Sequence, residues 1–549
     1  MFRGGTLRVH THYSMFYVVG SGPAGISCAK ALVDHGAEVT VVDVGRECER
    51  EVLDRVGRLR SIDPTQWEPA LVEGIGGSMF WDRTSPPPLK SVYGSTFPYA
   101  LDDSDIGSQV GTSCVQSLAA GGLSNVWGAA VLPYAASDLA GWPIGEEEFC
   151  DHYAAVARMM PIAGIRDDLE ETFPYYAEPL PGPRSSRQTE QLESRLKRQR
   201  ARLAARGITF GRSRLALRTT AGPHGEGCQY VGLCLTGCPY FAIYNTADSL
   251  SELRTHPRFR YEPLCKVDEV AELGGSAVTL RGRRVDTGQD FRFTGQRAFL
   301  AAGVISTTCI ILRSLGRYDH PVRLRYHPYF LLPLVTLENV PCIASERLHT
   351  LAQLFLEIQD SRISDRRVHL QLYTYNAAIR DRLRGVLARV PGLSTWLERL
   401  LLGRLLAVQG YLHGGEDTAI EARLRRGPAP AGDKLELTGT LSGVTQRRIR
   451  AVYWKLVRCA SLLGALPVPR MLYIGQPGEG NHIGSAFPMR AEPGPLQTDL
   501  VGRLPDFRRV HIVDASVLPS LPATTITYGA MANAHRIGTA AARLEEGRR

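Results

Sequence analysis

The chain has 549 residues, of which 44% are hydrophobic and 22% are charged. This ordinary globular composition excludes a disordered, collagen-like or low-complexity protein, and the length predicts about two to four domains. The net charge is +9, but only six of the 64 basic residues are lysine. We therefore interpret the charge as a compositional bias, which permits an anionic substrate or a membrane surface without indicating one.

The cysteines and the N-terminus indicate a reducing compartment. There are 11 cysteines, an odd number in a long chain, and no secretory signal pattern precedes the first motif. No apolar run reaches the roughly 18 residues that a membrane-spanning helix needs. We expect a cytoplasmic protein with free thiols.

The first ordered unit is predicted after a loose extension at residues 1–14. Residues 15–19 (MFYVV) have the pattern of a buried strand, GSGPAG that of a turn, and residues 26–35 that of a short helix ending at Gly36. A second strand, AEVTVVD, follows. This order predicts a βαβ unit.

A glycine fingerprint lies in the turn of this unit. Gly20, Gly22 and Gly25 form G-x-G-x-x-G between the strand and the helix, and Asp43 follows at the end of the second strand. The glycines permit a tight turn, close approach of a pyrophosphate and close helix packing, while the acid accepts hydrogen bonds from a ribose. The motif predicts a dinucleotide site without separating FAD from NAD.

The rest of the chain divides into segments of different character. Residues 50–105 are mixed and rich in proline, 111–130 are crowded with small residues, 186–206 are helical, and 258–303 form short strands before a helix at 306–315. Within 320–475, strands with long apolar runs precede a helical stretch at 379–412, and the chain ends in a helix at 527–546.

Two of these segments favour FAD. LAAGVIST (300–307) and HIVDASVLP (511–519) each end a strand in small residues. Three such strand ends fit one long, extended cofactor.

We therefore expect an α/β fold in which a doubly wound FAD-binding domain, built from discontinuous segments, accompanies a mixed sheet-and-helix substrate domain. The expected division is an extension at 1–14, the main FAD-binding part at 15–319 with inserted loops at 50–105 and 155–255, a substrate domain at 320–474, and a return to the FAD-binding domain at 475–549.

Several motifs, in order, resemble those of the glucose–methanol–choline (GMC) family of flavin oxidoreductases. They are VVGSGPAGISCAKAL with Asp43, GGLSNVWGAAV, LAAGVISTTCIILRSLG, NHIGSAFPM and VHIVDASVLPSLPATTITYGAMANA. The resemblance spans the cofactor domain, whereas residues 320–470 resemble nothing specific.

The resemblance implies a role for each matching residue. The ADP half of FAD would be held by Gly20, Gly22, Gly25 and Asp43, and the adenine would meet the backbone of Val267 near Ala302 and Gly303. The residues expected along the pyrophosphate, ribityl chain and flavin ring are Gly121, Gly122, Ser124, Asn125, Asp514 and Ala515.

His482 matches the active-site histidine of the family. Oxidation of an alcohol removes a hydroxyl proton and a carbon-bound hydride. Flavin N5 accepts the hydride, and a neutral imidazole accepts the proton. Read without the resemblance, a lone histidine before a Gly-Ser turn is more often structural.

The chain departs from the family at the second catalytic position. A histidine or asparagine usually follows the VDxS-type motif, but here the stretch is SLPATTITYG, so the position falls near Ala523 or Thr524. Thr524 or Thr525 offers only a hydroxyl. Other candidate partners for His482 are His327, His413 and Tyr528, whereas His535 is expected to be packed in a helix or exposed.

Cys228, Cys234 and Cys238 form a C-x5-C-x3-C pattern in a glycine-rich loop. Zinc ribbons and four-iron clusters use other spacings, and nothing in the pattern requires Cys265 as a fourth ligand, so we expect a structural loop and no metal.

Residues 379–412 combine apolar residues at helical spacing with arginines, and Pro391 and Gly392 interrupt the run. Leu383, Val386, Leu387 and Val390 lie on the first predicted helix; Trp396, Leu397, Leu400, Leu401 and Leu405 lie on the second. Such a pair fits either the core of the substrate domain or a peripheral membrane contact.

The leading hypothesis is an FAD-dependent oxidoreductase that converts a CH–OH group to a carbonyl on a small-molecule alcohol, such as a sugar, glycoside or other polyhydroxylated metabolite. One alternative is non-oxidative chemistry on the same fold (a lyase, isomerase or decarboxylase), and another is a membrane-peripheral flavoprotein that acts on a lipid-linked alcohol or whose FAD is structural. No module for nucleic acid is apparent, and the sequence names no electron acceptor.

Overall fold

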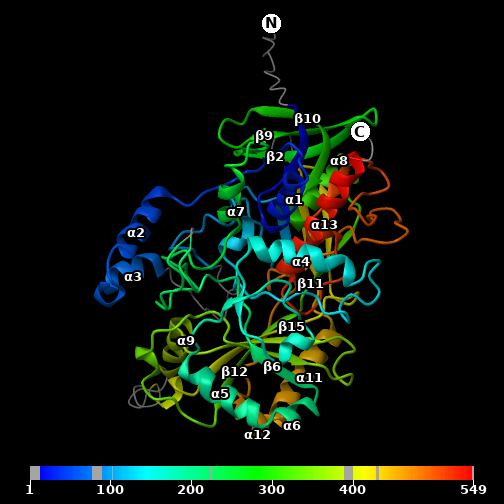
Figure 1. Cartoon of the computed structure of the whole chain (residues 1–549). Helices are drawn as coiled ribbons and strands as arrows, with labels where there is room; N and C mark the ends of the chain where they lie inside the picture. The colour runs from blue at the N-terminus through cyan, green and yellow to red at the C-terminus, as the bar shows by residue number, and fades with distance from the viewer. Residues whose placement is uncertain are drawn as a thin grey trace.

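The computed structural model describes residues 13–76, 90–101, 103–222, 225–388, 398, 400–427 and 432–546. Three large sheets dominate this part of the chain, and we number them in the order described below. Figure 1 shows the first sheet and its helices at one end of the molecule and the third sheet with its helices at the other.

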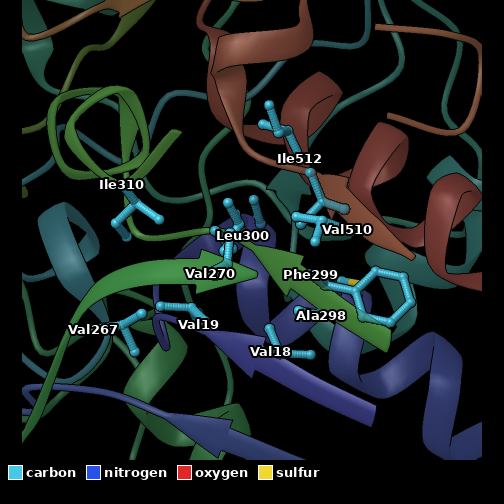
Figure 2. Close-up of a cluster of buried hydrophobic side chains, with 14 of the residues drawn as sticks. Val18, Val19, Val267, Val270, Ala298, Phe299, Leu300, Ile310, Val510 and Ile512 are labelled. Atoms are coloured by element: carbon cyan, nitrogen blue, oxygen red, sulfur yellow. The ribbon is translucent and has the colours of Figure 1, made fainter. Parts of the chain in front are cut away.

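The first sheet is mostly parallel and contains seven strands. Its order is β7 (Phe259–Glu262), β2 (Val39–Val42), β1 (Tyr13–Val19), β10 (Asp290–Leu300), β9 (Ala277–Arg284) and β8 (Cys265–Leu273). The last part of β10 also pairs with β21 (Val510–Ile512), so segments more than 200 residues apart lie side by side. Figure 2 shows the apolar side chains that these strands bury, including Val18, Leu300 and Ile512.

Helices cover this sheet and fix the strand ends. α1 (Pro23–Asp34) packs along α13 (Ile526–Glu546), where Ser27 Oγ donates to the Met531 carbonyl at 2.7 Å. α8 (Val304–Ser314) follows β10 directly, α4 (Glu147–Met159) packs on α13, and α7 (Thr246–Leu253) contacts α1. The final helix of the chain thus locks onto its first βαβ unit (Figure 1).

The second sheet has five strands and reaches His482 at its edge. Its order is β20 (Ile483–Gly484), β11 (Val322–Tyr326), β16 (Ala419–Arg425), β17 (Lys434–Gly439) and β3 (Ile106–Val110). β20 pairs with β11 directly after His482. β11 is followed after only two residues by the first long strand of the third sheet, so the two sheets meet beside this histidine.

The third sheet is antiparallel. Its order is β18 (Ala465–Pro467), β12 (Tyr329–Thr336), β15 (Leu405–Leu412), β14 (Val368–Tyr373), β13 (Leu354–Ile358) and β6 (Ile208–Arg212), and β19 (Tyr473–Ile474) also pairs with β12. One face packs on α5 (Arg187–Arg198), α6 (Arg200–Ala204), α11 (Gly443–Arg458) and α12 (Ala460–Leu463) through leucines and other aliphatic residues. Because side chains alternate along a strand, the opposite face is free to carry polar groups.

The remaining elements are peripheral. α2 (Arg50–Arg60) and α3 (Pro69–Gly76) project to one side of the molecule (Figure 1), and α9 (Ala377–Leu387) lies beside the third sheet. A small sheet pairs β4 (Ala163–Gly164) with β5 (Leu180–Pro181). Within the described residues, no helix combines the length and apolar character needed to cross a bilayer.

The predicted α/β class is confirmed, as are the first βαβ unit, the short strands at 258–303 and the long final helix. The predicted helical stretch at 379–412 is wrong at its end, because Leu405 begins β15 rather than continuing a helix. The first six residues of LLAVQGYL alternate between half-buried and buried positions, which is the period of a strand. Trp396, Leu397 and Val390 lie outside the described residues. The predicted domain limits stay a prediction.

Candidate active site

The glycine fingerprint forms the turn between β1 and α1. Gly20 has φ +100°, and an added Cβ there would lie 2.5 Å from the Ala301 carbonyl oxygen. An added Cβ on Gly25 would lie only 2.0 Å from the Gly20 oxygen, whereas one on Gly22 would meet no protein atom within 4 Å. Gly25 therefore serves packing, and the open space at Gly22 fits the close approach of a pyrophosphate.

Asp43 is buried at the end of β2, where a ribose would be recognised. Ser21 and Tyr261 both donate to its Oδ2 atom, the latter at 3.2 Å. Burial raises the pKa of Asp43 to about 6, while these hydrogen bonds oppose the rise. Backbone N–H groups of Val44 and Gly45 also hydrogen-bond to this carboxylate, whose two oxygens together have about four acceptor sites.

The loop of small residues at 119–126 packs against the fingerprint. Gly121 donates its N–H to Ser21 Oγ at 3.1 Å, and an added Cβ on Gly122 would lie 3.3 Å from the Gly22 Cα. Ser124 donates to the Gly121 carbonyl, and Asn125 donates to the Gly122 carbonyl at 2.7 Å. The predicted pyrophosphate and flavin residues therefore form one rigid loop over the fingerprint turn.

The other predicted cofactor residues lie at neighbouring strand ends. Asp514 accepts hydrogen bonds from the Gly303 N–H at 3.0 Å and from the Thr307 hydroxyl at 2.6 Å. Gly303 has φ +84°, is exposed and directly precedes α8 as its N-cap, next to Ala302.

Ala515 follows Asp514 and accepts from the Ser485 N–H. Val267 lies near the start of β8, where the Cys265 N–H donates to the Asp43 carbonyl. The fingerprint turn, residues 302–303 and residues 514–515 thus reach the same edge of the first sheet, as a long extended cofactor requires.

His482 lies where the second and third sheets meet. Its ring Nδ1 is 3.1 Å from the ring Nδ1 of His327. In addition, the backbone N–H of His327 donates to the backbone carbonyl of His482. Asn481 and Ser485 on either side have φ near +60°, a left-handed conformation that costs energy for residues other than glycine. The surrounding structure therefore holds this histidine in a defined position.

Burial lowers the pKa of His482 to about 4, and the nearby His369 adds to this effect. Burial also holds the pKa of His327 well below its usual range, with further contributions from His482 and His413. Both imidazoles are therefore neutral at pH 7. In a hydrogen bond between the two Nδ1 atoms, one must carry the proton. If His482 carries it on Nδ1 and donates to His327, the Nε2 atom of His482 keeps its lone pair.

A row of polar side chains continues from His482 across the third sheet, and we call it the polar face. The ring of Tyr411 lies 5.2 Å from that of His482, and Gln409 donates to the Tyr411 hydroxyl at 2.7 Å. On β14 and β13, His369 Nδ1 lies 2.5 Å from Glu357 Oε1. The polar face comprises Glu357, His369, Gln371, Tyr373, Gln409 and Tyr411.

Two members of the polar face are only half-buried, Tyr373 and Gln409, so they border open space. The Tyr373 hydroxyl donates to Gln371 at 3.0 Å and lies 3.5 Å from where a Cβ on Gly128 would stand. Gly128 follows the predicted flavin loop, so the polar face approaches the predicted cofactor site. None of the six residues of the polar face is predicted as functional from the sequence.

Among the candidate partners of His482, the structure places His327 in contact with it. Thr524 and Thr525 are buried, and neither hydroxyl has a hydrogen-bond partner in the described structure. Tyr528 instead donates to the Tyr153 carbonyl at 2.9 Å. His413 is half-buried, and burial lowers its pKa to about 4.

His535 is packed against another helix, in line with the expectation for it. Its Nδ1 lies 2.9 Å from Nδ1 of His152 on α4.

The cysteine loop and α9 are both packed into the protein. Cys228, Cys234 and Cys238 pack against an apolar core, and the Thr350 N–H donates to Cys234 Sγ at 3.4 Å. All 11 cysteines are free thiols, and the described residues contain no group of three or more histidine, cysteine or acidic side chains placed to hold a metal ion.

On α9, Leu383 and Leu387 are buried against Val340, Ile343 and Leu402.

Comparison by sequence finds one local similarity. Residues 18–48 match the model of the NAD(P)-binding Rossmann-like domain. The comparison with curated protein sequences finds no match. The local match covers the fingerprint and Asp43, the part of the site that depends on a short contiguous motif.

Comparison by structure finds similar proteins over the whole chain. Pyridoxine 4-oxidase from Mesorbium loti has a TM-score of 0.58 at 14% identity, with 97% of this chain and 99% of that chain covered. A formate oxidase has a TM-score of 0.61 at 11% identity, with 98% and 99% covered. Formate oxidase of Aspergillus oryzae RIB40 in a variant form gives the same score, identity and coverage. The chain therefore shares the fold of these oxidases, and the fold that the GMC resemblance implies is confirmed.

Proposed function

We propose that this chain is an FAD-dependent oxidoreductase that oxidises a CH–OH group of a small molecule to a carbonyl. The observation that carries the proposal is the neutral His482, held against His327 where the second sheet meets the polar face of the third sheet. The shared fold with pyridoxine 4-oxidase and formate oxidase supports oxidase-type chemistry.

FAD fits the residues present. Gly22 leaves open space for the pyrophosphate, Asp43 can accept from the ribose, and the loop at 119–126 with Gly303 and Ala515 lines the same edge. We assign the adenine contact to Val267 and the flavin-side contacts to Gly121, Gly122, Ser124, Asn125 and Asp514. When bound, the flavin supplies the acceptor for the hydride that leaves the carbinol carbon.

His482 would act as the base. Its Nε2 lone pair accepts the hydroxyl proton as the C–H bond breaks, and the imidazolium that forms keeps its Nδ1–H on His327. The O–H and C–H bonds are broken, the C=O bond is formed, and two electrons leave with the hydride. His327 fixes the tautomer of His482 that this step requires. We therefore assign to His327 the role of partner of the catalytic histidine, for which the sequence offered Thr524.

The polar face supports a polyhydroxylated substrate such as a sugar or glycoside. Tyr373 and Gln409 offer hydrogen-bonding groups to open space, and Glu357 has a carboxylate oxygen without a partner in the described structure. A ligand with several hydroxyl groups can satisfy such buried groups, whereas an aliphatic alcohol would leave them unpaired.

The contacts favour this function over the alternatives. The missing second catalytic side chain motivates a non-oxidative reaction, but His327 supplies an imidazole beside His482 and so removes this motive. The basic, amphipathic character of 379–412 motivates a membrane-peripheral role, but the buried positions of Leu383 and Leu387 support a core role instead.

The test is anaerobic reduction of the purified holoenzyme. We would record the oxidised flavin spectrum and add free sugars, glycosides, nucleotide sugars, sterols and long-chain alcohols separately. The proposal predicts bleaching of the flavin by a polyhydroxylated class. A flavin that stays oxidised with every class would favour non-oxidative chemistry, and purified protein without flavin would contradict the cofactor assignment.

A further inference from the structure

Four residues of the polar face form one continuous hydrogen-bond relay. Glu357 Oε1 lies 2.5 Å from the Nδ1 atom of His369, and Gln371 Nε2 lies 3.2 Å from the other ring nitrogen, Nε2. The Gln371 Oε1 atom lies 3.0 Å from the Tyr373 hydroxyl. The first three residues are at most 2% exposed, whereas Tyr373 is half-buried. The relay therefore begins in the interior at Glu357 and ends beside open space at Tyr373.

The chemistry of each group fixes the direction of the relay. An amide nitrogen can only donate, so the Nε2 atom of His369 accepts from Gln371 and carries no proton. The ring proton of His369 is then on Nδ1, where the Glu357 carboxylate accepts it. Because the amide nitrogen of Gln371 faces His369, its oxygen faces Tyr373 and accepts the phenolic proton. The hydroxyl proton of Tyr373 thus points along the relay into the protein.

Tyr373 consequently presents its oxygen, and not its proton, to open space. Burial raises the pKa of Tyr373 above its usual range, so the hydroxyl stays protonated at neutral pH. Its oxygen lies 3.5 Å from where a Cβ on Gly128 would stand, so it faces the segment that follows the predicted flavin loop. A phenolic oxygen whose proton is already committed has only lone pairs left to offer a ligand.

We infer that the relay holds the Tyr373 hydroxyl as a hydrogen-bond acceptor and thereby selects a substrate that places a donor against it, a hydroxyl or a protonated amino group. A carboxylate at this position offers only lone pairs, so it faces another acceptor and loses its water without a replacement partner. Glu357, His369 and Gln371 act through Tyr373 and are positioning residues. The inference rests on the proposed function for the place of the substrate, whereas the direction of the relay does not.

The test compares two matched probes, xylitol and sodium xylonate, in which a carboxylate replaces one terminal CH–OH group. The half-saturating concentration of each is read from the flavin spectrum of the holoenzyme without oxygen and at constant ionic strength, whether the flavin is only perturbed or is bleached. We expect the wild-type enzyme to need at least about tenfold more xylonate than xylitol, because the carboxylate leaves the Tyr373 oxygen without a donor.

Two variants separate the relay from the tyrosine itself. Gln371→Leu frees the Tyr373 proton to donate to a ligand, so the preference for xylitol over xylonate should shrink at least about threefold. Tyr373→Phe removes the acceptor, so the half-saturating concentration of xylitol should rise about fivefold. The matched control is Gln353→Leu, because Gln353 Nε2 makes the same 3.2 Å contact with an imidazole, that of His349, but its oxygen accepts from no tyrosine. The control should keep the wild-type preference.

Neutron diffraction from deuterated crystals of the wild-type enzyme locates the protons without any variant or substrate. We expect deuterium on Nδ1 of His369 and the hydroxyl deuterium of Tyr373 directed at Gln371. This measurement decides the direction of the relay even if Gln371→Leu does not fold.

Three results would overturn the inference. They are a Tyr373 deuterium directed away from Gln371, a wild-type flavin spectrum that responds to xylitol no more readily than to xylonate, and a Gln371→Leu enzyme that keeps the wild-type preference. A preference for xylitol that perturbs the flavin but bleaches it with no polyhydroxylated compound would instead contradict the proposed oxidation and support the inference, so the two failures are distinguishable.

Discussion

The fingerprint edge of the first sheet and the polar face of the third sheet present functional groups in different ways. At the fingerprint, the backbone forms the site, and glycine is required because another atom would collide with Ala301 or Gly20 or fill the ligand space. On the polar face, side chains from separate strands form the site, and the backbone is ordinary antiparallel sheet. The first kind of site is specified by a short motif, and the second by strand pairing over long distances in the chain.

The largest expected effects come from the fingerprint glycines, where Gly22 is expected to serve cofactor binding and Gly25 to serve packing. Gly22→Val should weaken FAD binding at least about 100-fold and leave the fold intact, because Gly22 has φ −66° and open space at its Cβ position. Gly25→Val should give no folded protein, since its Cβ would lie 2.0 Å from the Gly20 oxygen. Flavin titration and circular dichroism measure both. A Gly22 variant that binds FAD normally would show that this turn does not face the cofactor.

The next effect concerns the histidine that joins the two regions. His327→Gln should lower kcat about 10- to 100-fold at unchanged flavin content, because an amide that can either donate or accept replaces the imidazole nitrogen that fixes the tautomer of His482. His349→Gln is the control, as His349 is also buried and neutral but pairs with Gln353. Steady-state kinetics of the two variants should differ. Equal, small losses of kcat in both variants would show that His327 serves only packing.

A smaller effect is expected on the polar face. Tyr373→Phe should raise KM about fivefold for a polyhydroxylated substrate and change kcat less than about twofold, since one hydrogen bond made equally in ground and transition states is lost. Tyr318→Phe removes a hydroxyl that donates to Asp433 elsewhere and serves as control. A fall in kcat with unchanged KM would place Tyr373 in the chemical step.

The smallest effect is the response to pH. Because burial lowers the pKa of His482 to about 4, the base is unprotonated at neutral pH, and kcat/KM should stay level until the pH falls toward that value. The same lowered pKa means that the unfolded chain binds more protons below about pH 6.5, so stability is lost as the pH falls from there. Initial rates and circular dichroism at each pH separate the two effects. An acid limb near pH 6.5 in folded protein would contradict a lowered pKa of His482.

The contrast between the regions also explains what the sequence could predict. The first βαβ unit was predictable because its glycines and Asp43 are close together and each has a steric or hydrogen-bonding reason. The cofactor residues at 121–125, 302–303 and 514–515 needed the family resemblance, because nothing local tells which strand ends meet. His327 was one of several candidates, and only the pairing of β11 with β20 brings it to His482.

The polar face left a weak signal. The segment VHLQLY alternates strictly, with His369, Gln371 and Tyr373 at every second position. This alternation predicts a strand, but it cannot distinguish a polar face that is buried at a site from one that faces water. Glu357 lies 12 residues from His369, and only the register of β13 against β14 makes them a pair. The helix expected through Leu405 was wrong because aliphatic residues fit either period over a short run.

The central claim is that His482 takes the proton as a CH–OH group is oxidised, and the most direct measurement is the rate of anaerobic flavin reduction in His482→Ala. With the alcohol that bleaches the wild-type flavin, the account predicts a reduction rate about 10² to 10⁴ lower at full flavin content. His152→Gln, from the other histidine pair, should reduce its flavin at the wild-type rate. Flavin reduction at an unchanged rate in His482→Ala would contradict the account.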